Sequence, residues 1–382
     1  MKKILFASLL AFSSAAMADY KITFSASNLQ LPEEIAATVS KIECGDHHCY
    51  ALVDGAVWSV GYNNYGQLGR TGDTTKWAST GLSDVSDIAS GGYHGYALKN
   101  DGTLWAVGRN NSGQLGINNT IDQSTWVYAG LSDVSKVVSG YYHGYAIKNN
   151  KTLWSVGRNT QGQLGRNNTI DQLTWVYAGL SDVSVVSAGF YHGYAVRSDG
   201  RLFSVGFNDY GQLGRNGTEN QSTWGYAGLS NVREVSGSTR GGYALKNDGT
   251  LWSIGYNAQG QLGRNGTTHQ STWGYAGLSG VSKVVAGGYH GYAIKNDGTA
   301  WSIGRNSDGQ LGRKGTVHQS TWGYNGLSDV SKVAAGSNSG YIIKNNNTVL
   351  SVGRNNFGML GLGDTTNRSE WTELTEPFKS SE

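Results

Sequence analysis

The four residues Gly-Gln-Leu-Gly return along the chain at a nearly constant interval, and this repetition constrains the fold more than any other feature. Copies begin at residues 66, 113, 162, 211, 260 and 309, and a seventh, at 358, reads Gly-Met-Leu-Gly. The first step is 47 residues and the other five are 49. A constant period of this length predicts seven repeated supersecondary units, none of which buries its hydrophobic face without a neighbour.

Each unit is predicted to contain four short strands. In one unit the first three strands are expected at 134–138, 145–148 and 153–157, and in the next unit a fourth is expected at 224–229. Asn-Asp-Gly between the second and third strands favours a tight hairpin, because these residues accept a positive φ. The chain has 57 glycines, two prolines, 22 tyrosines and 12 tryptophans, a composition typical of many short strands joined by turns.

Seven sheets that must each be covered on two faces are satisfied by a ring, which leaves no open end. The segment at 31–32 aligns with the position that Trp occupies in later units, and Trp371 supplies that position again after the last repeat. One terminus is therefore expected to close the ring. The sequence predicts an all-β, seven-bladed β-propeller of four-stranded antiparallel blades, closed between its N- and C-terminal segments. An open solenoid is the alternative, although neither terminus shows the polar cap that it needs.

The first 18 residues have the layout of a cleavable secretory signal: Lys2 and Lys3, an apolar stretch, and a small-residue end at Ala16-Met17-Ala18. We divide the chain into this signal (1–18), an N-terminal extension (19–30), the propeller (31–376) and a tail (377–382). Export to the periplasm or beyond is expected, without membrane insertion. Of 30 basic residues two lie in the signal, against 27 acidic ones, so the mature chain carries +1 and gives no reason to expect a nucleic-acid partner.

Two cysteines, Cys44 and Cys49, flank a predicted turn in Glu-Cys-Gly-Asp-His-His-Cys. A four-residue turn brings the flanking positions opposite each other across a hairpin, and an oxidising compartment favours a disulfide between them. A metal site that uses both cysteines with His47 or His48 is the alternative. It is disfavoured because a structural zinc site needs four well-spaced ligands, so we predict no metal and no cofactor.

The motif Gly-x-Asn-x-x-Gly-Gln-Leu-Gly, as at Gly108 to Gly116, follows a second motif, Gly-Gly-Tyr-His-Gly-Tyr-Ala-Leu, at Gly91 to Leu98. Together with the Asp-Gly hairpin they resemble the regulator of chromosome condensation repeat, over about residues 31–376. This resemblance implies a seven-bladed propeller. The chain departs from the family pattern in one respect, because it has Trp before the fourth strand where the family often has Pro.

The resemblance implies divided functions. Founding members are similar to guanine-nucleotide exchange factors that act on a small GTPase through one propeller face and a wedge, for which the even spacing here leaves no room. Other relatives are exported bacterial propellers, one of which inhibits β-lactamases. We therefore expect an exported, monomeric, non-enzymatic protein that binds another protein, as a scaffold, inhibitor or effector. The alternatives are a carbohydrate-binding lectin and an exchange-factor-like effector on a host small GTPase.

A histidine recurs at one position of five units and suggests either structural hydrogen bonding or a ring of metal ligands or bases. Ligands on separate blades would have to converge to about 2 Å from one ion, so the structural interpretation is favoured. No spacing typical of a catalytic triad, a carboxylate pair or a phosphate loop accompanies these histidines, and we predict no catalytic residue. They are His48, His94, His143, His192 and His290, replaced by Gly241 and Ser339 in the other units.

Tryptophan and tyrosine recur two residues apart on the fourth strand and are the candidate binding residues. Exposed aromatic rings form sugar-stacking platforms or protein hot spots, whereas buried rings of this kind would wedge the blades together. The sequence leaves both interpretations open. The set comprises Trp77, Trp126, Trp175, Trp224, Trp273, Trp322 and Trp371, with Tyr128, Tyr177, Tyr226, Tyr275 and Tyr324.

Charged residues also recur with the period. If the basic and acidic sets lie on different rims, they would polarise the disc and orient a partner. If not, they are solvated charges at strand ends. The basic sets are Lys99, Lys148, Arg197, Lys246, Lys295 and Lys344, and Arg70, Arg166, Arg215, Arg264 and Arg313; the acidic set is Asp84, Asp133, Asp182 and Asp329.

Overall fold

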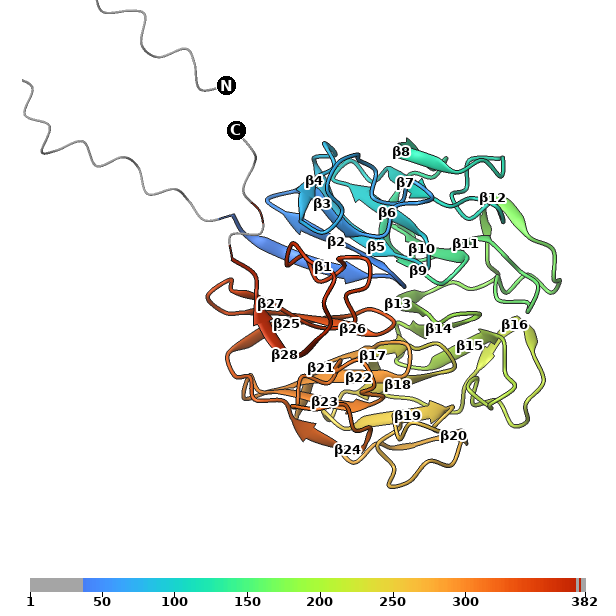
Figure 1. Cartoon of the computed structure of the whole chain (residues 1–382). Coiled ribbons are helices and arrows are strands. Elements are labelled where there is room, and N and C mark those ends of the chain that lie inside the picture. The colour runs from blue at the N-terminus through green and yellow to red at the C-terminus, as the bar shows by residue number, and fades with distance from the viewer. Residues whose placement is uncertain (1–36, 376–377, 379–382) are drawn as a thin grey trace, which may run out of the picture. The chain divides into compact units, whose positions relative to one another are not determined.

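Seven sheets of four antiparallel strands are arranged in a ring (Figure 1). The computed structural model describes residues 37–375 and residue 378, and this part of the chain contains 28 strands and no helix. Each sheet is built from four consecutive strands in sequence order. The predicted signal, the extension and the 31–32 segment lie outside the described residues, as does nearly all of the predicted tail.

The first four blades span Val39 to Tyr226. Within each blade, consecutive strands pair as antiparallel hairpins. The strands are β1 Val39–Cys44, β2 His48–Val53, β3 Ala56–Gly61 and β4 Ala78–Ser79 in blade 1; β5 Val85–Ser90, β6 His94–Lys99, β7 Leu104–Gly108 and β8 Gln123–Tyr128 in blade 2; β9 Val134–Ser139, β10 His143–Lys148, β11 Leu153–Gly157 and β12 Gln172–Tyr177 in blade 3; and β13 Val183–Ala188, β14 His192–Arg197, β15 Leu202–Gly206 and β16 Gln221–Tyr226 in blade 4.

The last three blades repeat this arrangement between Val232 and Glu373. Their strands are β17 Val232–Gly237, β18 Gly241–Lys246, β19 Leu251–Gly255 and β20 Gln270–Tyr275 in blade 5; β21 Val281–Ala286, β22 His290–Lys295, β23 Ala300–Gly304 and β24 Gln319–Tyr324 in blade 6; and β25 Val330–Ala335, β26 Ser339–Lys344, β27 Val349–Gly353 and β28 Arg368–Glu373 in blade 7.

The first three strands of each blade lie where the sequence predicts them, but the fourth strand is displaced. The prediction of 224–229 is wrong at both ends, because β16 begins at Gln221 and ends at Tyr226. After Tyr226 the chain turns through Gly228, which has a φ of 76°, and Ala227 donates its N–H to the Leu202 carbonyl. The residues that follow the strand therefore form the turn into the next blade.

The ring closes where blade 1 meets blade 7, which lie side by side as blue and red segments in Figure 1. Val39 and Ile42 share one hydrophobic core with Tyr341 and Ile343. Asn347 donates its Nδ2–H to the Ala37 carbonyl at 2.6 Å and accepts the Val39 N–H at 3.1 Å. The predicted closed ring is confirmed, and both terminal blades keep four strands of their own.

Neighbouring blades are joined by one aromatic pair at each junction. A buried tyrosine on the second strand of one blade packs against the tryptophan before or on the fourth strand of the next, with ring centroids 5.5–5.8 Å apart. Each tyrosine hydroxyl donates to a carbonyl in the Gly-Gln-Leu-Gly loop of its own blade, as Tyr145 does to Gln163. The pairs are Tyr50–Trp126, Tyr96–Trp175, Tyr145–Trp224, Tyr194–Trp273, Tyr243–Trp322, Tyr292–Trp371 and Tyr341–Trp77.

The repeated motif forms a loop that holds itself together and receives that tryptophan. In blade 3 the Oδ1 of Asn159 accepts the Leu164 N–H at 2.8 Å, and its Nδ2–H donates to the Asn168 carbonyl at 3.0 Å. Gly165 has a φ of 75°, and a Cβ at this position would collide with the indole of Trp224. The asparagine and the last glycine of the motif are thus required by the fold.

Candidate functional site

Two kinds of connection share one face of the ring. Because successive strands run in opposite directions, the turns between first and second strands and the loops between third and fourth strands emerge on the same side. We call this surface the loop face. The third-to-fourth connections of blades 2–7 all have the same length, 14 residues each, as at 109–122 and 158–171. The loop face is therefore built on a regular frame.

The side chains of the loop face differ from blade to blade, although the frame is nearly invariant. At the interblade positions all seven units have Tyr and all seven have Trp. Three loop-face positions are less constant. From blade 1 to blade 7, the residue directly before the second strand is His47, Tyr93, Tyr142, Tyr191, Arg240, Tyr289 and Asn338, and the residue before that is Asp46, Gly92, Tyr141, Phe190, Thr239, Gly288 and Ser337. The residue directly after the third strand is Tyr62, Arg109, Arg158, Phe207, Tyr256, Arg305 and Arg354.

Aromatic rings gather at the centre of this face. Tyr141 stacks on Phe190 with centroids 3.8 Å apart and planes at 20°, and Tyr93 meets Tyr141 edge-on at 5.6 Å. The hydroxyls of Tyr93 and Tyr141 both donate to the Oδ2 of Asp46 at 3.3 Å. Burial, with the neighbouring Tyr93 hydroxyl and Asp46 carboxylate, raises the pKa of Tyr141. The cluster is a partly buried aromatic patch around the Asp46 carboxylate, and it belongs to blades 1–4.

A second aromatic group lies on the blade 7 side of the patch. His47 packs against Phe357 at 4.8 Å, and Tyr62 meets Phe357 at 5.0 Å and Tyr93 at 5.9 Å. Burial lowers the pKa of His47, so its imidazole is mostly neutral at pH 7. The aromatic surface is thus continuous across the junction where the ring closes.

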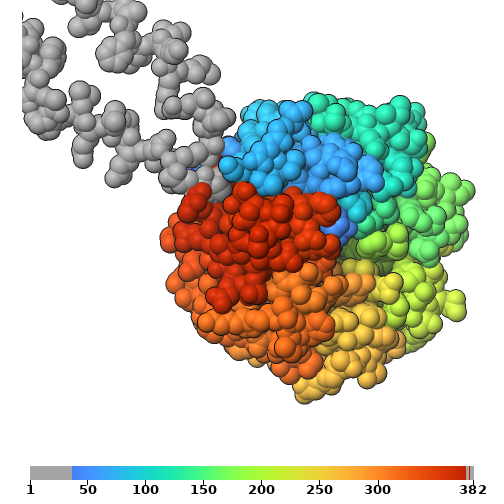
Figure 2. Space-filling model, in the orientation of Figure 1, coloured from blue at the N-terminus to red at the C-terminus, as the bar shows by residue number. Residues whose placement is uncertain are grey.

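The loop face surrounds one mouth of a central channel. The first strands of the seven blades line a cavity of about 810 Å³, and a smaller cavity of about 100 Å³ lies among the turns at its end, including Asp46, Tyr141 and Phe190. A recess is visible in Figure 2 where the blue, green and red segments approach one another. At the third position of the first strand, six blades have a charged residue and blade 4 has Val185. The charged residues are Lys41, Asp87, Lys136, Glu234, Lys283 and Lys332.

These channel charges are largely paired. Lys41 lies 2.8 Å from both Glu43 and Asp87, and Lys136 lies 2.9 Å from Asp87. Burial lowers the pKa of Lys41, but the two carboxylates outweigh burial and leave that pKa above its ordinary value. Burial likewise raises the pKa of Asp87, yet the two lysines hold it below its usual range. The network stabilises the channel wall.

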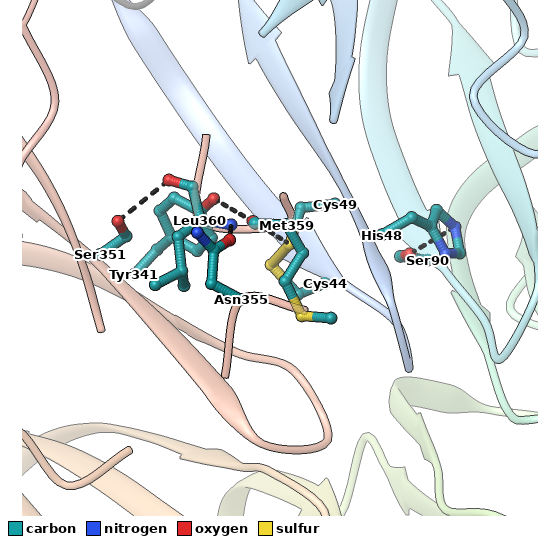
Figure 3. Close-up of a disulfide and its surroundings, with 9 residues drawn as sticks. All are labelled: Cys44, His48, Cys49, Ser90, Tyr341, Ser351, Asn355, Met359 and Leu360. Carbon is teal, nitrogen blue, oxygen red and sulfur yellow. Dashed lines mark hydrogen bonds between the residues drawn. A yellow bond between two sulfur atoms is a disulfide. The ribbon is translucent and has the colours of Figure 1, made fainter. Parts of the chain in front are cut away.

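The five recurring histidines are buried, and they do not converge on one ion. The Nε2 of His48 lies 3.1 Å from Ser90 Oγ (Figure 3), that of His94 lies 2.9 Å from Ser139 Oγ, and that of His192 lies 3.1 Å from the Gly241 carbonyl. Burial lowers the pKa of His48, His94, His143 and His290 to about 3 and that of His192 to about 4. Among residues 37–375, no three His, Cys, Asp or Glu side chains are grouped to hold a metal.

The tryptophans and tyrosines predicted as one binding set are separated by the structure. Indoles such as those of Trp77 and Trp175 are only 6% exposed and lie between blades, so they offer no free face for a sugar. The tyrosines are 47–49% exposed at the outer edge, where each pairs with a third-strand residue, as Tyr128 does with Trp105. Binding through this set stays a prediction, and only its tyrosines are accessible.

The predicted disulfide between Cys44 and Cys49 is confirmed. It joins the end of β1 to the start of β2, two residues that are paired in the hairpin register. Figure 3 shows it beside the loop of blade 7, where the Sγ of Cys49 lies 3.8 Å from the Met359 carbonyl oxygen. The bridge therefore ties the hairpin that forms half of the ring-closing junction.

The recurring charges do not polarise the disc. Lys148 lies 3.6 Å from Asp133 and Arg197 lies 2.9 Å from Asp182, so the basic and acidic sets share one edge. Of the two interpretations, these contacts favour charges at strand ends over separate rims, because the second strand ends where the first strand begins. The arginines after the repeated motif contact backbone, as Arg215 and Arg264 do with the Thr223 and Thr272 carbonyls at 2.8 and 3.0 Å.

Family models match several parts of this chain. Two models described as the regulator of chromosome condensation (RCC1) repeat match it, one at residues 85–114, 134–163, 183–212 and 281–310, the other at 54–98 and 101–147. The chain contains RCC1 repeats. None of the curated proteins matches the sequence significantly. Within residues 37–375 there is no helix of the length and hydropathy needed to cross a membrane.

Solved structures share the RCC1-repeat fold. Yeast Prp20, in the structure "Crystal structure of Kap60 bound to yeast RCC1 (Prp20)", superposes with a TM-score of 0.76 at 19% identity, covering 96% of this chain and 91% of Prp20. A second structure, of Prp20p from Saccharomyces cerevisiae, gives 0.76 at 18% identity over 89% and 87% of the two chains. Human WBSCR16 gives 0.72 at 21% identity over 80% and 85%.

The residues of the loop face were missed when the sequence was searched for repeated residues. Tyr141 and Phe190 lie at a position where the other units carry different residues, and Arg109 recurs only at Arg158, Arg305 and Arg354, so no pattern common to all seven units marks them. The useful signal is variation between the repeats, because the positions that vary lie on the connections of one face. Aligning the seven units and scoring their differences would have identified this surface.

Proposed function

We propose that this RCC1-repeat protein is an exported, non-enzymatic binding protein that recognises one protein partner through the loop face. The observation that carries the proposal is the distribution of variation: the frame is repeated almost unchanged, whereas the side chains around the channel mouth vary among the blades, most strongly at the position of Asp46, Tyr141 and Phe190. Loops on a rigid frame are the usual location of binding residues. A face whose sectors are not all alike suits an asymmetric partner.

The composition of the loop face supports a protein partner. Tyrosine and arginine dominate it, and these residues are enriched at interface hot spots. Tyr141 and Phe190 are held by stacking, which lowers the entropy lost when a partner orders them. The small volume of the cavity at the channel mouth favours contact with a surface over the enclosure of a small substrate.

Affinity capture with matched variants tests the proposal. The bait is the chain from residue 19 to residue 382, exposed to culture medium and envelope extract of the producing organism. Tyr141→Ala with Phe190→Ala removes the centre of the loop face, and Tyr177→Ala with Tyr226→Ala removes aromatic rings from the outer edges of the same two blades. We expect a protein that is retained by wild type and by the edge variant but lost by the loop-face variant. Retention by all three baits, or loss only with the edge variant, contradicts the proposal.

A second candidate is action on a small GTPase, favoured by the similarity to Prp20p, whose structure is titled for its binding properties to Gsp1p and histones. The equal loops of blades 2–7 provide no inserted segment on the loop face for such an activity. A nucleotide-release assay over a panel of small GTPases separates the two candidates. Stimulated release that the loop-face variant abolishes would establish the second.

A further inference from the structure

Two arginines alternate with three tyrosines across blades 2, 3 and 4 of the loop face. The guanidinium carbon of Arg109 lies 5.8 Å from the ring centroid of Tyr93 and 5.3 Å from that of Tyr142. That of Arg158 lies 5.7 Å from Tyr142 and 5.2 Å from Tyr191. We call Tyr93, Arg109, Tyr142, Arg158 and Tyr191 the ladder. Each guanidinium is held between aromatic rings, an arrangement that stabilises a cation.

The ladder arginines have no carboxylate partner. Within the described residues no Asp or Glu oxygen lies within 4 Å of either guanidinium; Arg109 donates to the Tyr142 hydroxyl at 3.3 Å, and Arg158 donates to Thr160 Oγ1 at 3.0 Å and to the Tyr191 hydroxyl at 3.5 Å. The nearby carboxylates of Asp122 and Asp171 accept the backbone N–H groups of Asn110 and Asn159 at 2.7 Å. Several guanidinium N–H groups therefore remain available, in a fork that matches a carboxylate.

Exposed aliphatic side chains accompany the same two blades. Ile121 and Ile170 are 67% and 68% exposed, and each directly precedes the aspartate that binds the backbone beside its blade's ladder arginine. Val317, at the equivalent position of blade 6, is 72% exposed, so an exposed aliphatic residue does not by itself mark a contact region. The ladder thus combines two preorganised cations with apolar groups on the same pair of loops.

We infer that the ladder is the anchor for an acidic segment of the protein partner, with carboxylates bound by Arg109 and Arg158 and apolar residues packed over Ile121 and Ile170. The inference rests on the proposed function and specifies the chemistry of its partner. Charge complementarity indicates an acidic occupant, because aromatic rings orient the two arginines and no carboxylate of the described residues pairs with them. Arg305 offers the contrast: it occupies the same repeat position in blade 6 but lies 3.7 Å from Asp308.

Panning a random peptide library on the full mature chain tests this inference. Three baits are compared: wild type, the ladder variant Arg109→Gln with Arg158→Gln, and the control Arg305→Gln with Arg354→Gln, which removes the same charge from the same repeat positions of blades 6 and 7. We expect wild type and control to enrich peptides rich in Asp and Glu interspersed with apolar residues. The ladder variant should bind such a peptide about tenfold more weakly or worse, and binding by wild type should weaken as salt is added.

The outcomes separate the inference from the proposed function. Enriched peptides that lack acidic residues, bind the ladder variant as well as wild type, and fail to bind the Tyr141→Ala with Phe190→Ala variant of the capture experiment would overturn the inference and leave the loop face as the binding surface. Failure to enrich any acidic peptide would also overturn the inference. The proposed function would not be affected by that result, because it is tested by the capture experiment. Heparin binding that is lost in the ladder variant, without acidic-peptide binding, would reassign the ladder to an anionic polysaccharide and contradict the inference. Loss of folding is checked by equal melting temperatures of the three baits.

Discussion

At the scale of single residues, the same aromatic types serve two purposes that depend on their position in the repeat. Trp175 is buried between two blades, whereas Tyr177, two residues later on β12, is 47% exposed. Residues two apart on a strand share a face, but strand β12 lies at the edge of its sheet, so the two rings meet different surroundings. The repeat period identifies both residues, but it does not show which of the two a neighbouring blade covers.

This pair gives a matched stability test. Trp175→Ala removes the indole that packs on Tyr96 and is expected to lower the free energy of unfolding by about 3 kcal/mol or more, as large-to-small changes of buried aromatics do. Tyr177→Ala on the same strand should change it by less than about 1 kcal/mol. Urea denaturation of both variants makes the comparison, and equal losses would contradict the assignment of the tryptophans to the blade junctions.

The buried histidines predict a loss of stability in acid. The pKa of His94 is about 3 in the folded protein and near 6.5 when unfolded, so below pH 6.5 the unfolded chain binds a proton that the folded chain does not. The contribution of neutral His94 to the free energy of unfolding is complete above pH 6.5 and declines as the pH falls toward 3. The variant His94→Ser has the residue type found at Ser339 in blade 7. When the pH falls from 6 to 5, its free energy of unfolding should decrease by about 1 kcal/mol less than that of wild type. Equal losses in chemical denaturation at the two pH values would contradict it.

At the scale of elements, the first hairpin has a constraint that no other blade shares. The Cys44–Cys49 bridge closes the β1–β2 turn next to blade 7. Cys44→Ser with Cys49→Ser should lower the free energy of unfolding by about 2 kcal/mol, the entropy expected for so short a loop. Thermal unfolding of the variant and of reduced wild type measures this, and unchanged stability in both would show that the packing of β1 against β25 is sufficient.

The sequence predicts the inner three strands of each blade well and the outer one poorly. Strands such as β11, Leu153–Gly157, are bounded by glycines and turn residues that the sequence displays. The limits of β16 depend on where the chain leaves the blade at Gly228, and this is decided by its contact with Leu202 across the sheet. The seven-bladed ring follows from the count of motifs. The loop face could not be predicted from residues common to all repeats, because Tyr141 and Phe190 stand where the other repeats have Asp, Gly, Thr or Ser, and Arg109 has a counterpart in only three other repeats.

At the scale of the whole molecule, the repeated frame positions the blades, and the varied loop face is the surface that we assign to recognition. Tyr–Trp pairs at all seven junctions position the blades, and this lets the connections on one side change without loss of the fold. The channel charges, the edge tyrosines and the paired rim charges belong largely to the frame. The aromatic patch is where one blade differs most from the next, the ladder adjoins it, and we place recognition there.

Hydrogen exchange of the captured complex tests this division most directly. Amide exchange is compared for the free protein and for its complex with the partner. We predict added protection in the turns at 91–93, 140–142 and 189–191 and in the loops at 109–122 and 158–171, with no change in the outer strands β12 and β16. Protection confined to β12, β16 and the exposed tyrosine edge would contradict the account.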